Sequence, residues 1–311
     1  MGVQALLKYI IKKIVTMIPV LVCITVIVFL ILHLAPGDPV DLIVGPNVTP
    51  EVYENIRNKL GLDQPLTVQY FKFMSNLLRG DLGTSILQQR PVSEIIIERF
   101  PVTLELGLSA LVISFAIALP AGIIAAVNRN SWPDYACMSG ALVGMSMPTF
   151  WFGILLMYFF AYKMRLFPIS GYGTLRHLVL PAFAMGLTDA AVTARMVRSS
   201  MLEVIRQDYI RTARSKGLAE KVVINQHALK NALIPIVTLL GLRMGWLLGG
   251  SVILENVFSR PGLGRLIVDS ILARDYPVVQ GAMIVLTASI MAGNILADIL
   301  YAVVDPRIKY N

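Results

Sequence analysis

The sequence predicts an all-α membrane protein with six transmembrane helices. Only 15% of its residues are charged, against about 25% in a typical soluble domain, and the mean hydropathy is +0.70. A bilayer core requires roughly 20 apolar residues of helix, and six stretches meet that length. In lipid a helix satisfies its own backbone, so even stretches rich in Val and Ile are expected to be helical. The stretches are 14–34, 106–127, 135–162, 178–194, 232–254 and 277–304.

The first apolar stretch resembles a signal peptide, because Lys8, Lys12 and Lys13 precede it. Its apolar run is too long for one, however, and its exit has no small-x-small cleavage site. We therefore predict an uncleaved first span. The two cysteines, Cys23 and Cys137, both lie in apolar stretches, where the simplest interpretation is two small hydrophobic side chains. Neither a disulfide framework nor a metal-binding spacing is present, and no cofactor is predicted.

Basic residues predict the orientation, because cytoplasmic loops are enriched in Lys and Arg. The N-terminus, the loop 195–231 and the tail 305–311 are basic and fall on one side of a six-span chain, which is expected to be the cytoplasm. The net charge of +8 fits anionic headgroups or acidic partner surfaces rather than nucleic acid. The expected divisions are 1–98 for the first span and its exported loop, 99–304 for a core with the other five spans and the loop 195–231, and 305–311 for the cytoplasmic tail.

The long segment between the first two spans is expected outside the cytoplasm and partly helical. A helical pattern begins at Thr49-Pro50-Glu51 and stops at Gly61. A second, over residues 68–78, ends before Gly80. Glycine directly after a periodic segment is a typical helix stop, so we predict a small helical cap over the outer face.

Catalytic signatures are missing from the sequence. There is no Gly-Lys dipeptide, so the phosphate-binding loop that cradles ATP is absent. No nucleophile–base constellation is recognisable either. We therefore expect a non-catalytic chain.

The basic loop contains a short amphipathic pattern over residues 208–217. Asp208 can act as the helix cap or as a first-turn anion, and Gly217 as the stop. Helical spacing places Tyr209, Ile210 and Ala213 on one face and turns Arg211 away. A helix this short is unstable alone in water. It requires a surface, and the residues alone leave open whether that surface is anionic lipid or a groove on a partner protein.

This loop resembles the EAA loop of ATP-binding-cassette (ABC) importer permeases, in the form used by the dipeptide, oligopeptide, glutathione and nickel branch. Asp208, Tyr209, Ala213 and Gly217 match the core of that motif, although Arg211 and Thr212 stand where other branches have Glu and Ala. The resemblance extends over the whole chain and is closest to the first of the branch's two permeases. Further matching stretches are Ala35–Pro39, Gly61–Leu66, Gly80–Gly83, His227–Pro235, Pro261–Arg265 and Arg274–Pro277.

The resemblance implies a fold, a function and partners. It implies the type I ABC importer permease fold, with residues 208–217 as the coupling helix between the fourth and fifth spans. It also implies a second homologous permease, two cytoplasmic ATPase subunits, an external solute-binding protein and a bacterial inner-membrane location. Short peptides are the expected solute, with glutathione and then nickel chelates as alternatives. A stand-alone secondary transporter is a remote alternative, which would need no coupling loop.

Three charged residues fall inside predicted spans: Asp189, Arg243 and Asp298. A charge at the bilayer centre is costly and usually faces the bundle interior or water. Each residue is therefore a candidate for the solute pathway or its gate, with Arg243 the better candidate because its planar fork suits a carboxylate. The competing interpretation is a structural pair, for example Asp189 with Arg243, which would hold the fourth and fifth spans together.

Overall fold

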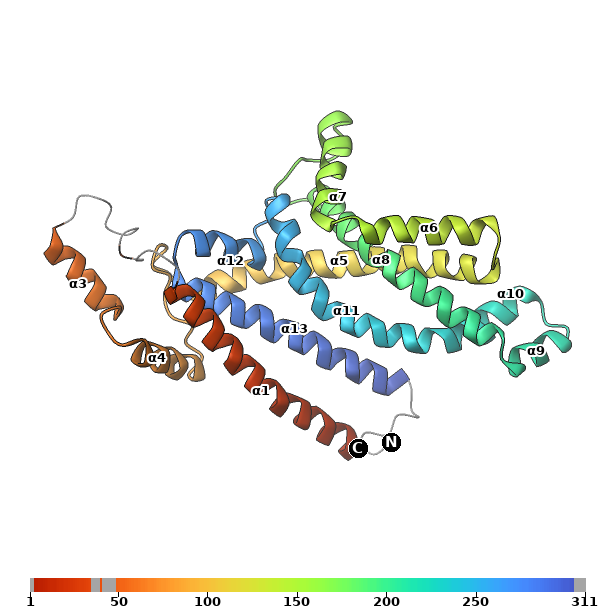
Figure 1. The fold of residues 1–311 in the computed structure, drawn as a ribbon, viewed down its shortest axis with the longest axis horizontal. Helices are drawn as coiled ribbons and strands as arrows, with labels where there is room; N and C mark the ends of the chain where they lie inside the picture. Colours follow the sequence, from red (N-terminus) through yellow and green to blue (C-terminus); the bar gives the residue numbers. More distant parts are fainter. Residues whose placement is uncertain (1–2, 35–39, 41–48, 305–311) are drawn as a thin grey trace. The chain divides into compact units, whose positions relative to one another are not determined.

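The computed structural model describes residues 3–34, 40 and 49–304. These residues are helical almost throughout, and the only β-pairing among them is an isolated bridge between Thr84 and Pro91. The tail 305–311 and the Ala35–Pro39 stretch lie outside the described residues. The α-helices, labelled in Figure 1, are α1 (Val3–Leu34), α3 (Pro50–Leu60), α4 (Leu66–Leu78), α5 (Val92–Val127), α6 (Trp132–Ser146), α7 (Thr149–Leu156), α8 (Leu175–Ile205), α9 (Asp208–Ser215), α10 (Glu220–Val222), α11 (Leu229–Val257), α12 (Leu263–Leu272) and α13 (Tyr276–Val304). Two π-helical turns, η1 (Met157–Lys163) and η2 (Val223–Ala228), extend α7 and precede α11.

The chain forms two compact units. Among the described residues, the larger unit comprises 3–10, 104–260 and 290–304, and the smaller unit comprises 11–103 and 261–289. The larger unit holds the helices α6 to α11, and the smaller one holds α3, α4 and α12. Helices α1, α5 and α13 each contribute residues to both.

The larger unit is organised by burial of apolar faces between helices. One core joins Leu106 and Ala110 of α5 to Met185 of α8 and Leu254 of α11. Glycines bring α5 and α8 into close contact along their length. A Cβ atom at Gly186 would lie 2.7 Å from the carbonyl oxygen of Ala110. Small residues of this kind allow the helix backbones to approach closely in membrane proteins.

The third predicted stretch, 135–162, is not one straight helix. It breaks between α6 and α7, whose axes differ by 103°. Met147 at the break is extended, with φ −87° and ψ 126°, and Pro148 follows it. Proline disfavours the helical conformation of the preceding residue and donates no N–H, which explains the break within an apolar stretch. The predicted apolar stretch is therefore helical in two parts.

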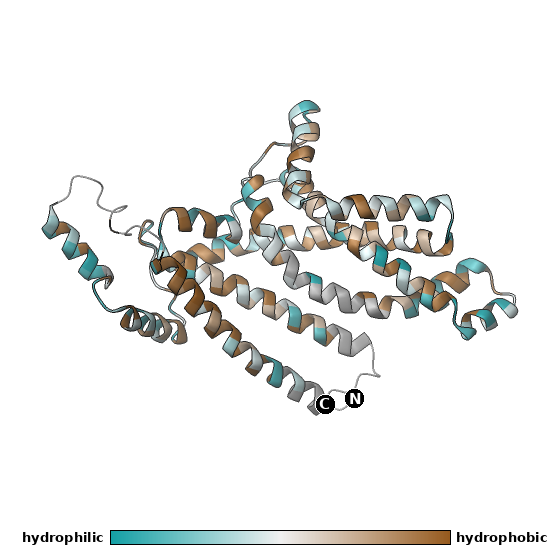
Figure 2. Ribbon diagram, in the orientation of Figure 1, coloured by the Kyte–Doolittle hydropathy of each residue, from teal (hydrophilic) through white to brown (hydrophobic). Residues whose placement is uncertain are grey.

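The smaller unit contains the two helices predicted for the exported segment. The first, α3, ends at Gly61, whose φ of 70° lies in the left-handed region that glycine favours. The second, α4, lies against α1: the hydroxyl groups of Tyr70 and Thr25 are 3.0 Å apart. Figure 2 shows α3 mostly hydrophilic and the part of α1 in this unit mostly hydrophobic.

Membrane crossings can be assigned by length and hydropathy among the described residues. Four helical segments qualify, Ile11–Leu34, Val92–Val127, Leu175–Ile205 and Tyr276–Ile299. The bent α6–α7 pair makes five if it counts as one crossing. The predicted fifth stretch, 232–254, lies within α11, and its role as a span stays a prediction. The all-α membrane class is confirmed, and the count of six is not settled by these helices.

Two alanine substitutions test the α5–α8 packing. At Gly122 a Cβ would lie 2.5 Å from the Cβ of Val197, whereas at Gly140 of α6 it would meet nothing within 4 Å. Alanine in a helix is favoured over glycine by about 1 kcal/mol, but overpacking costs about 1–3 kcal/mol. We expect Gly122→Ala to lower the free energy of unfolding and Gly140→Ala to leave it unchanged or raise it. Denaturation of the purified subunit in detergent measures both, and equal effects would contradict the close contact.

Candidate functional site

The segment predicted to couple to a partner forms the short helix α9, which follows α8 after two residues. In Figure 1, α9 and α10 lie at the C-terminal end of α8. Gln207, in the extended conformation, occupies the cap position without a side-chain cap bond, so the cap role considered for Asp208 is wrong. Asp208 instead opens the helix, with its side chain 98% exposed. A carboxylate in the first turn is favourable beside the positive end of the helix dipole.

The buried face of α9 consists of Ile210 and Ala213, which are 0% and 6% exposed. They belong to an apolar cluster that includes Met201 of α8 and Val223 of η2. This packing against its own chain stabilises a helix too short to persist alone. Tyr209 was expected on the same face, but it is 45% exposed. Around the helix Ala213 lies between Tyr209 and Ile210, and the chain packs against the Ile210 side of Ala213.

The end of α9 is built around Gly217. Its φ is 76° and its N–H donates to the carbonyl oxygen of Arg214 over 2.9 Å. A Cβ there would meet nothing within 4 Å. The Arg214 guanidinium binds both carboxylate oxygens of Glu220 and holds the pKa of that carboxyl below its ordinary value. Arg211 is 78% exposed, as predicted for the outer face.

Two of the three candidate pathway residues meet inside the larger unit. The Nη1 of Arg243 on α11 lies 3.3 Å from the Oδ1 of Asp189 on α8. Ser114 of α5 donates its hydroxyl to the other Asp189 oxygen over 2.7 Å. The Asp189 side chain is fully buried, and that of Arg243 is 20% exposed. Three helices therefore meet at one buried carboxylate, which is the pairing that the sequence offered as the structural alternative.

Asp298, the third candidate, lies half-buried on the part of α13 that belongs to the larger unit. In the same unit α11 and α13 approach closely. A Cβ at Gly245, two residues after Arg243, would lie 2.7 Å from the Oδ1 of Asn294. The segments that carry Arg243 and Asp298 thus run against each other.

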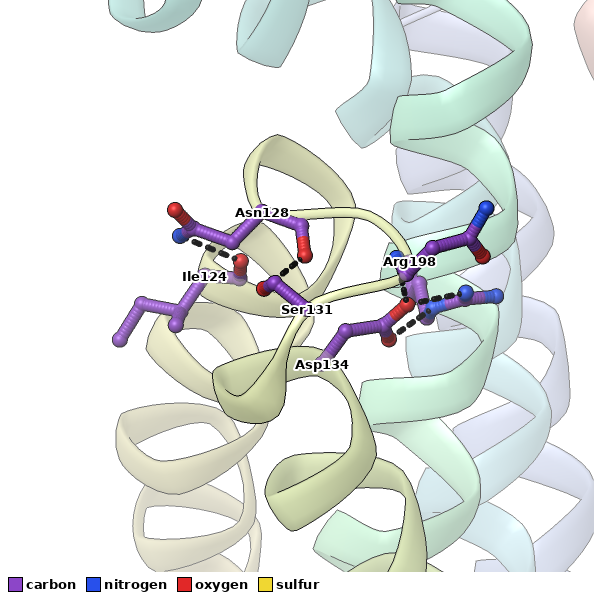
Figure 3. Close-up of polar contacts among 6 residues, drawn as sticks. Ile124, Asn128, Ser131, Asp134 and Arg198 are labelled. Carbon is purple, nitrogen blue, oxygen red and sulfur yellow. Dashed lines mark hydrogen bonds and ion pairs between the residues drawn. The ribbon is translucent and has the colours of Figure 1, made fainter.

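An ion pair that the sequence did not predict attaches α8 to α6. Arg198 donates from Nε and Nη2 to the two oxygens of Asp134, over 2.6 and 2.7 Å (Figure 3). Asp134 is 2% exposed and also accepts the N–H of Asn130 over 3.0 Å. In the sequence Arg198 is simply one of the basic residues of the loop 195–231. The pattern Ser131-Trp132-Pro133-Asp134 is typical of a helix start and so accounts for Asp134, but no sequence pattern indicates a contact between two residues 64 positions apart.

A second arginine missed by the sequence analysis is fully buried. Arg260 donates to the carboxylate of Glu105 over 2.8 Å and to the carbonyl oxygen of His177 over 3.4 Å. Its guanidinium also lies 5.2 Å from the ring centroid of Tyr172. It directly precedes the Pro261–Arg265 motif, and no local pattern in the sequence distinguishes it from an exposed loop arginine. Arg260 connects the end of α11 to α5 and to the start of α8.

Removing one partner of the Asp134–Arg198 pair should leave a buried carboxylate without its cation. Breaking a buried pair in this way typically costs about 3–5 kcal/mol, so Arg198→Met should lower the unfolding free energy strongly. Arg90→Met is the matched control, because the Arg90–Glu98 pair has the same 2.6 Å contact with side chains 42% and 53% exposed. Exposed pairs contribute about 0–1 kcal/mol. Similar losses in the two variants, measured by denaturation in detergent, would refute the difference.

Solved structures of ABC transporters share the fold. The MetNI methionine ABC transporter in an inward-facing conformation matches with a TM-score of 0.60 at 19% identity, over 68% of this chain and 97% of that one. An amino acid ABC transporter crystallised with histidines matches with a TM-score of 0.53 at 16% identity, over 70% and 95%. At these identities the likeness establishes the fold alone.

Sequence relatives match over nearly the full length. The glutathione transport system permease protein GsiC of Salmonella paratyphi A is 44% identical over 98% of this chain and 100% of its own length. GsiC of Escherichia coli O6:H1 is 45% identical over the same shares. Residues 118–310 match the family described as binding-protein-dependent transport system inner membrane component, and residues 6–107 match its N-terminal family. This chain therefore belongs to the inner-membrane components of binding-protein-dependent transport systems, as an ABC importer permease of the peptide and glutathione branch.

Proposed function

We propose that this permease forms half of the transmembrane pathway for glutathione or a closely related short peptide. The observation that carries the proposal is the 44–45% identity, over essentially the whole length, to permeases named for glutathione transport. Short peptides in general were the first expectation from the sequence, and the relatives favour the glutathione alternative over both general peptides and nickel chelates. Because the chain belongs to this family, the alternative of a stand-alone secondary transporter is excluded.

The proposed assembly contains the partners that such a permease needs. A second homologous permease completes the pathway, two cytoplasmic ATPase subunits supply the hydrolysis, and an external solute-binding protein delivers the solute. The chain itself carries no catalytic role in this scheme. Residues 195–231 and both termini face the cytoplasm, in keeping with the concentration of basic residues there.

Within this assembly α9 is the coupling helix that docks on an ATPase subunit. Ile210 and Ala213 fix the helix to its own chain, which leaves Asp208, Tyr209 and Arg211 on the accessible side. Since Met201 of α8 packs in the same cluster as Ile210, a displacement of α9 passes directly into α8. Tyrosine and arginine are enriched at protein–protein interfaces, which is consistent with docking of this side on a partner.

The buried ion pair between Asp189 of α8 and Arg243 of α11 supports a structural role for these residues more strongly than a role in the solute pathway. Asp189 has no exposure and is bound from two neighbouring helices, as expected of a charge that holds helices together in lipid. Arg243 keeps a fifth of its side chain accessible and remains the pathway candidate, with Asp298 on the adjoining helix as a candidate gate residue.

Solute uptake tests the proposed substrate. In a strain lacking this gene, uptake of labelled glutathione should fall to background and return when the gene is supplied. Uptake of labelled dialanine and of a labelled nickel chelate should change little. Loss of dialanine or nickel uptake with glutathione uptake intact would replace the proposed substrate by that solute.

Gly217→Val tests the coupling helix. The free subunit has room for the side chain, so only the left-handed backbone opposes it, at a cost of about 1–2 kcal/mol. A docked ATPase would meet the added branches directly. We expect the variant to insert normally, to lose co-purifying ATPase and to lose uptake.

Gly80→Val is the matched control, because its φ is 79° and its Cβ site is equally open. The valine at position 80 has the same backbone cost, but in the proposed topology it lies on the outer side of the membrane. We therefore expect Gly80→Val to retain the ATPase subunits. Normal assembly and uptake in Gly217→Val would exclude the coupling role of α9.

A further inference from the structure

A cavity of about 370 Å³ lies entirely within the smaller unit, away from every residue assigned above. It is open on one side and is lined by the C-terminal end of α1, the end of α3, the face of α4, Thr84 and Ile86, and the first turns of α13. Gly61–Leu66 and Arg274–Pro277, two stretches that carry the family resemblance and have no part in coupling, both contribute residues to its wall. Its volume falls in the range of small-molecule sites, roughly 300–1,000 Å³.

One wall of the cavity is an ordered aromatic and hydrogen-bonded layer. The rings of Phe29 and His33 stack with their centroids 4.0 Å apart, and Tyr276 lies 5.3 Å from His33. His33 bonds through Nδ1 to the carbonyl oxygen of Phe29 and through Nε2 to the Oε1 of Gln69, over 2.8 and 3.1 Å. The Gln69 amide in turn donates to the main-chain oxygen of Gln64 over 2.8 Å. This wall is fixed by its own contacts without a ligand.

The charged side chains among the described residues that line the cavity are all basic. Lys59 and Lys72 line it, and among the residues that the structure describes around it none is acidic. Asp275 lies next to Tyr276 in the sequence, but its carboxylate accepts the hydroxyl of Ser85 and the N–H of Ile86. The cavity therefore offers two ammonium groups to a negatively charged ligand.

One amide in the wall is left without a partner among the described residues. Gln280 lines the cavity and is 6% exposed, and no hydrogen bond of its amide to another described residue is present. Peptide groups, which carry both an N–H and a carbonyl, are complementary to such an amide.

From these observations we propose that the cavity is a low-affinity receiving site for a small anionic peptide with two free carboxylates, the class to which glutathione belongs. The two lysines pair with the carboxylates, Gln280 bonds to a peptide group, and the aromatic wall contacts the aliphatic part. The site rests on the proposed function and deepens it, because it gives the permease its own recognition of the solute beside that of the binding protein.

Direct binding tests the site in the assembled importer, reconstituted in nanodiscs without its binding protein. Equilibrium dialysis with labelled glutathione should show saturable binding. Neutralising both lysines, with Lys59→Gln and Lys72→Gln together, should weaken it roughly fivefold to tenfold, within the range for two lost exposed charge pairs. Arg79→Gln, which removes one charge from the end of α4 outside the cavity, should leave binding unchanged. Trialanine, with a single carboxylate, should compete poorly.

Gln280→Leu separates recognition from folding. Replacing an unpartnered buried amide by an apolar side chain of similar size is expected to preserve or raise stability, yet it removes a peptide contact. We expect unchanged denaturation and weaker glutathione binding. Absence of saturable binding to the wild-type importer, or equal binding by the lysine double variant and Arg79→Gln, would overturn the proposal.

Two further outcomes identify which claim has failed. If the lysine double variant binds glutathione normally but loses affinity for the binding protein, the cavity is a protein-docking surface and the solute site is wrong. If the wild-type importer binds and transports no glutathione in any assay, the proposed function itself fails. If glutathione uptake is normal and glutathione binding is unaltered in all variants, the proposed receiving site is wrong but the proposed function stands.

Discussion

Burial of charge between helices is the constraint on which the larger unit depends. Helices in lipid gain little hydrophobic driving force from meeting one another, so packing and polar contacts must hold them together. Asp189–Arg243, Asp134–Arg198 and Glu105–Arg260 each join two segments distant in sequence. In each pair at least one side chain is 3% exposed or less. A charge in such a place is tolerated only with its partner, so the pairs specify which helices are neighbours.

Helix α8 takes part in two of these pairs and contacts the third. Asp189 joins it to α11, Arg198 joins it to α6, and the carbonyl oxygen of His177 near its start accepts from Arg260. Ser200 adds a hydrogen bond to the carbonyl oxygen of Ala232, over 2.9 Å. The same helix leads directly into α9. A displacement of α9 therefore acts on a helix that is bonded to its neighbours at several points along its length. We expect such a helix to move together with those neighbours rather than to bend locally.

The sequence predicted those features that depend on local patterns. Helices α3 and α4, the left-handed Gly217 and the buried Ile210 and Ala213 all follow from spacing and glycine placement. Tyr209 was placed wrongly because a shared stripe in the sequence does not decide which of two adjacent residues faces the core. Hydropathy is uniform across 135–162, so Pro148 was the only local sign of the break there. The Asp134–Arg198 and Arg260 contacts depend on tertiary packing, which no local pattern records. The domain boundaries and the roles of the site residues stay predictions.

The break between α6 and α7 has a consequence for what must surround it. The last carbonyls of α6 have no N–H partner further along, because Met147 is extended and Pro148 has none to donate. Hydrocarbon cannot hydrate such groups, and non-helical backbone at membrane depth persists only against protein or water. Beside the break lies a cavity lined by Gly144, Met147, Phe152 and Thr188, whose wall is almost wholly apolar. The unpaired carbonyl groups at the break therefore need polar surroundings. Where the α6–α7 pair crosses a bilayer, lipid acyl chains cannot be the only neighbours of the break, and another polypeptide or water must contact the backbone near Met147.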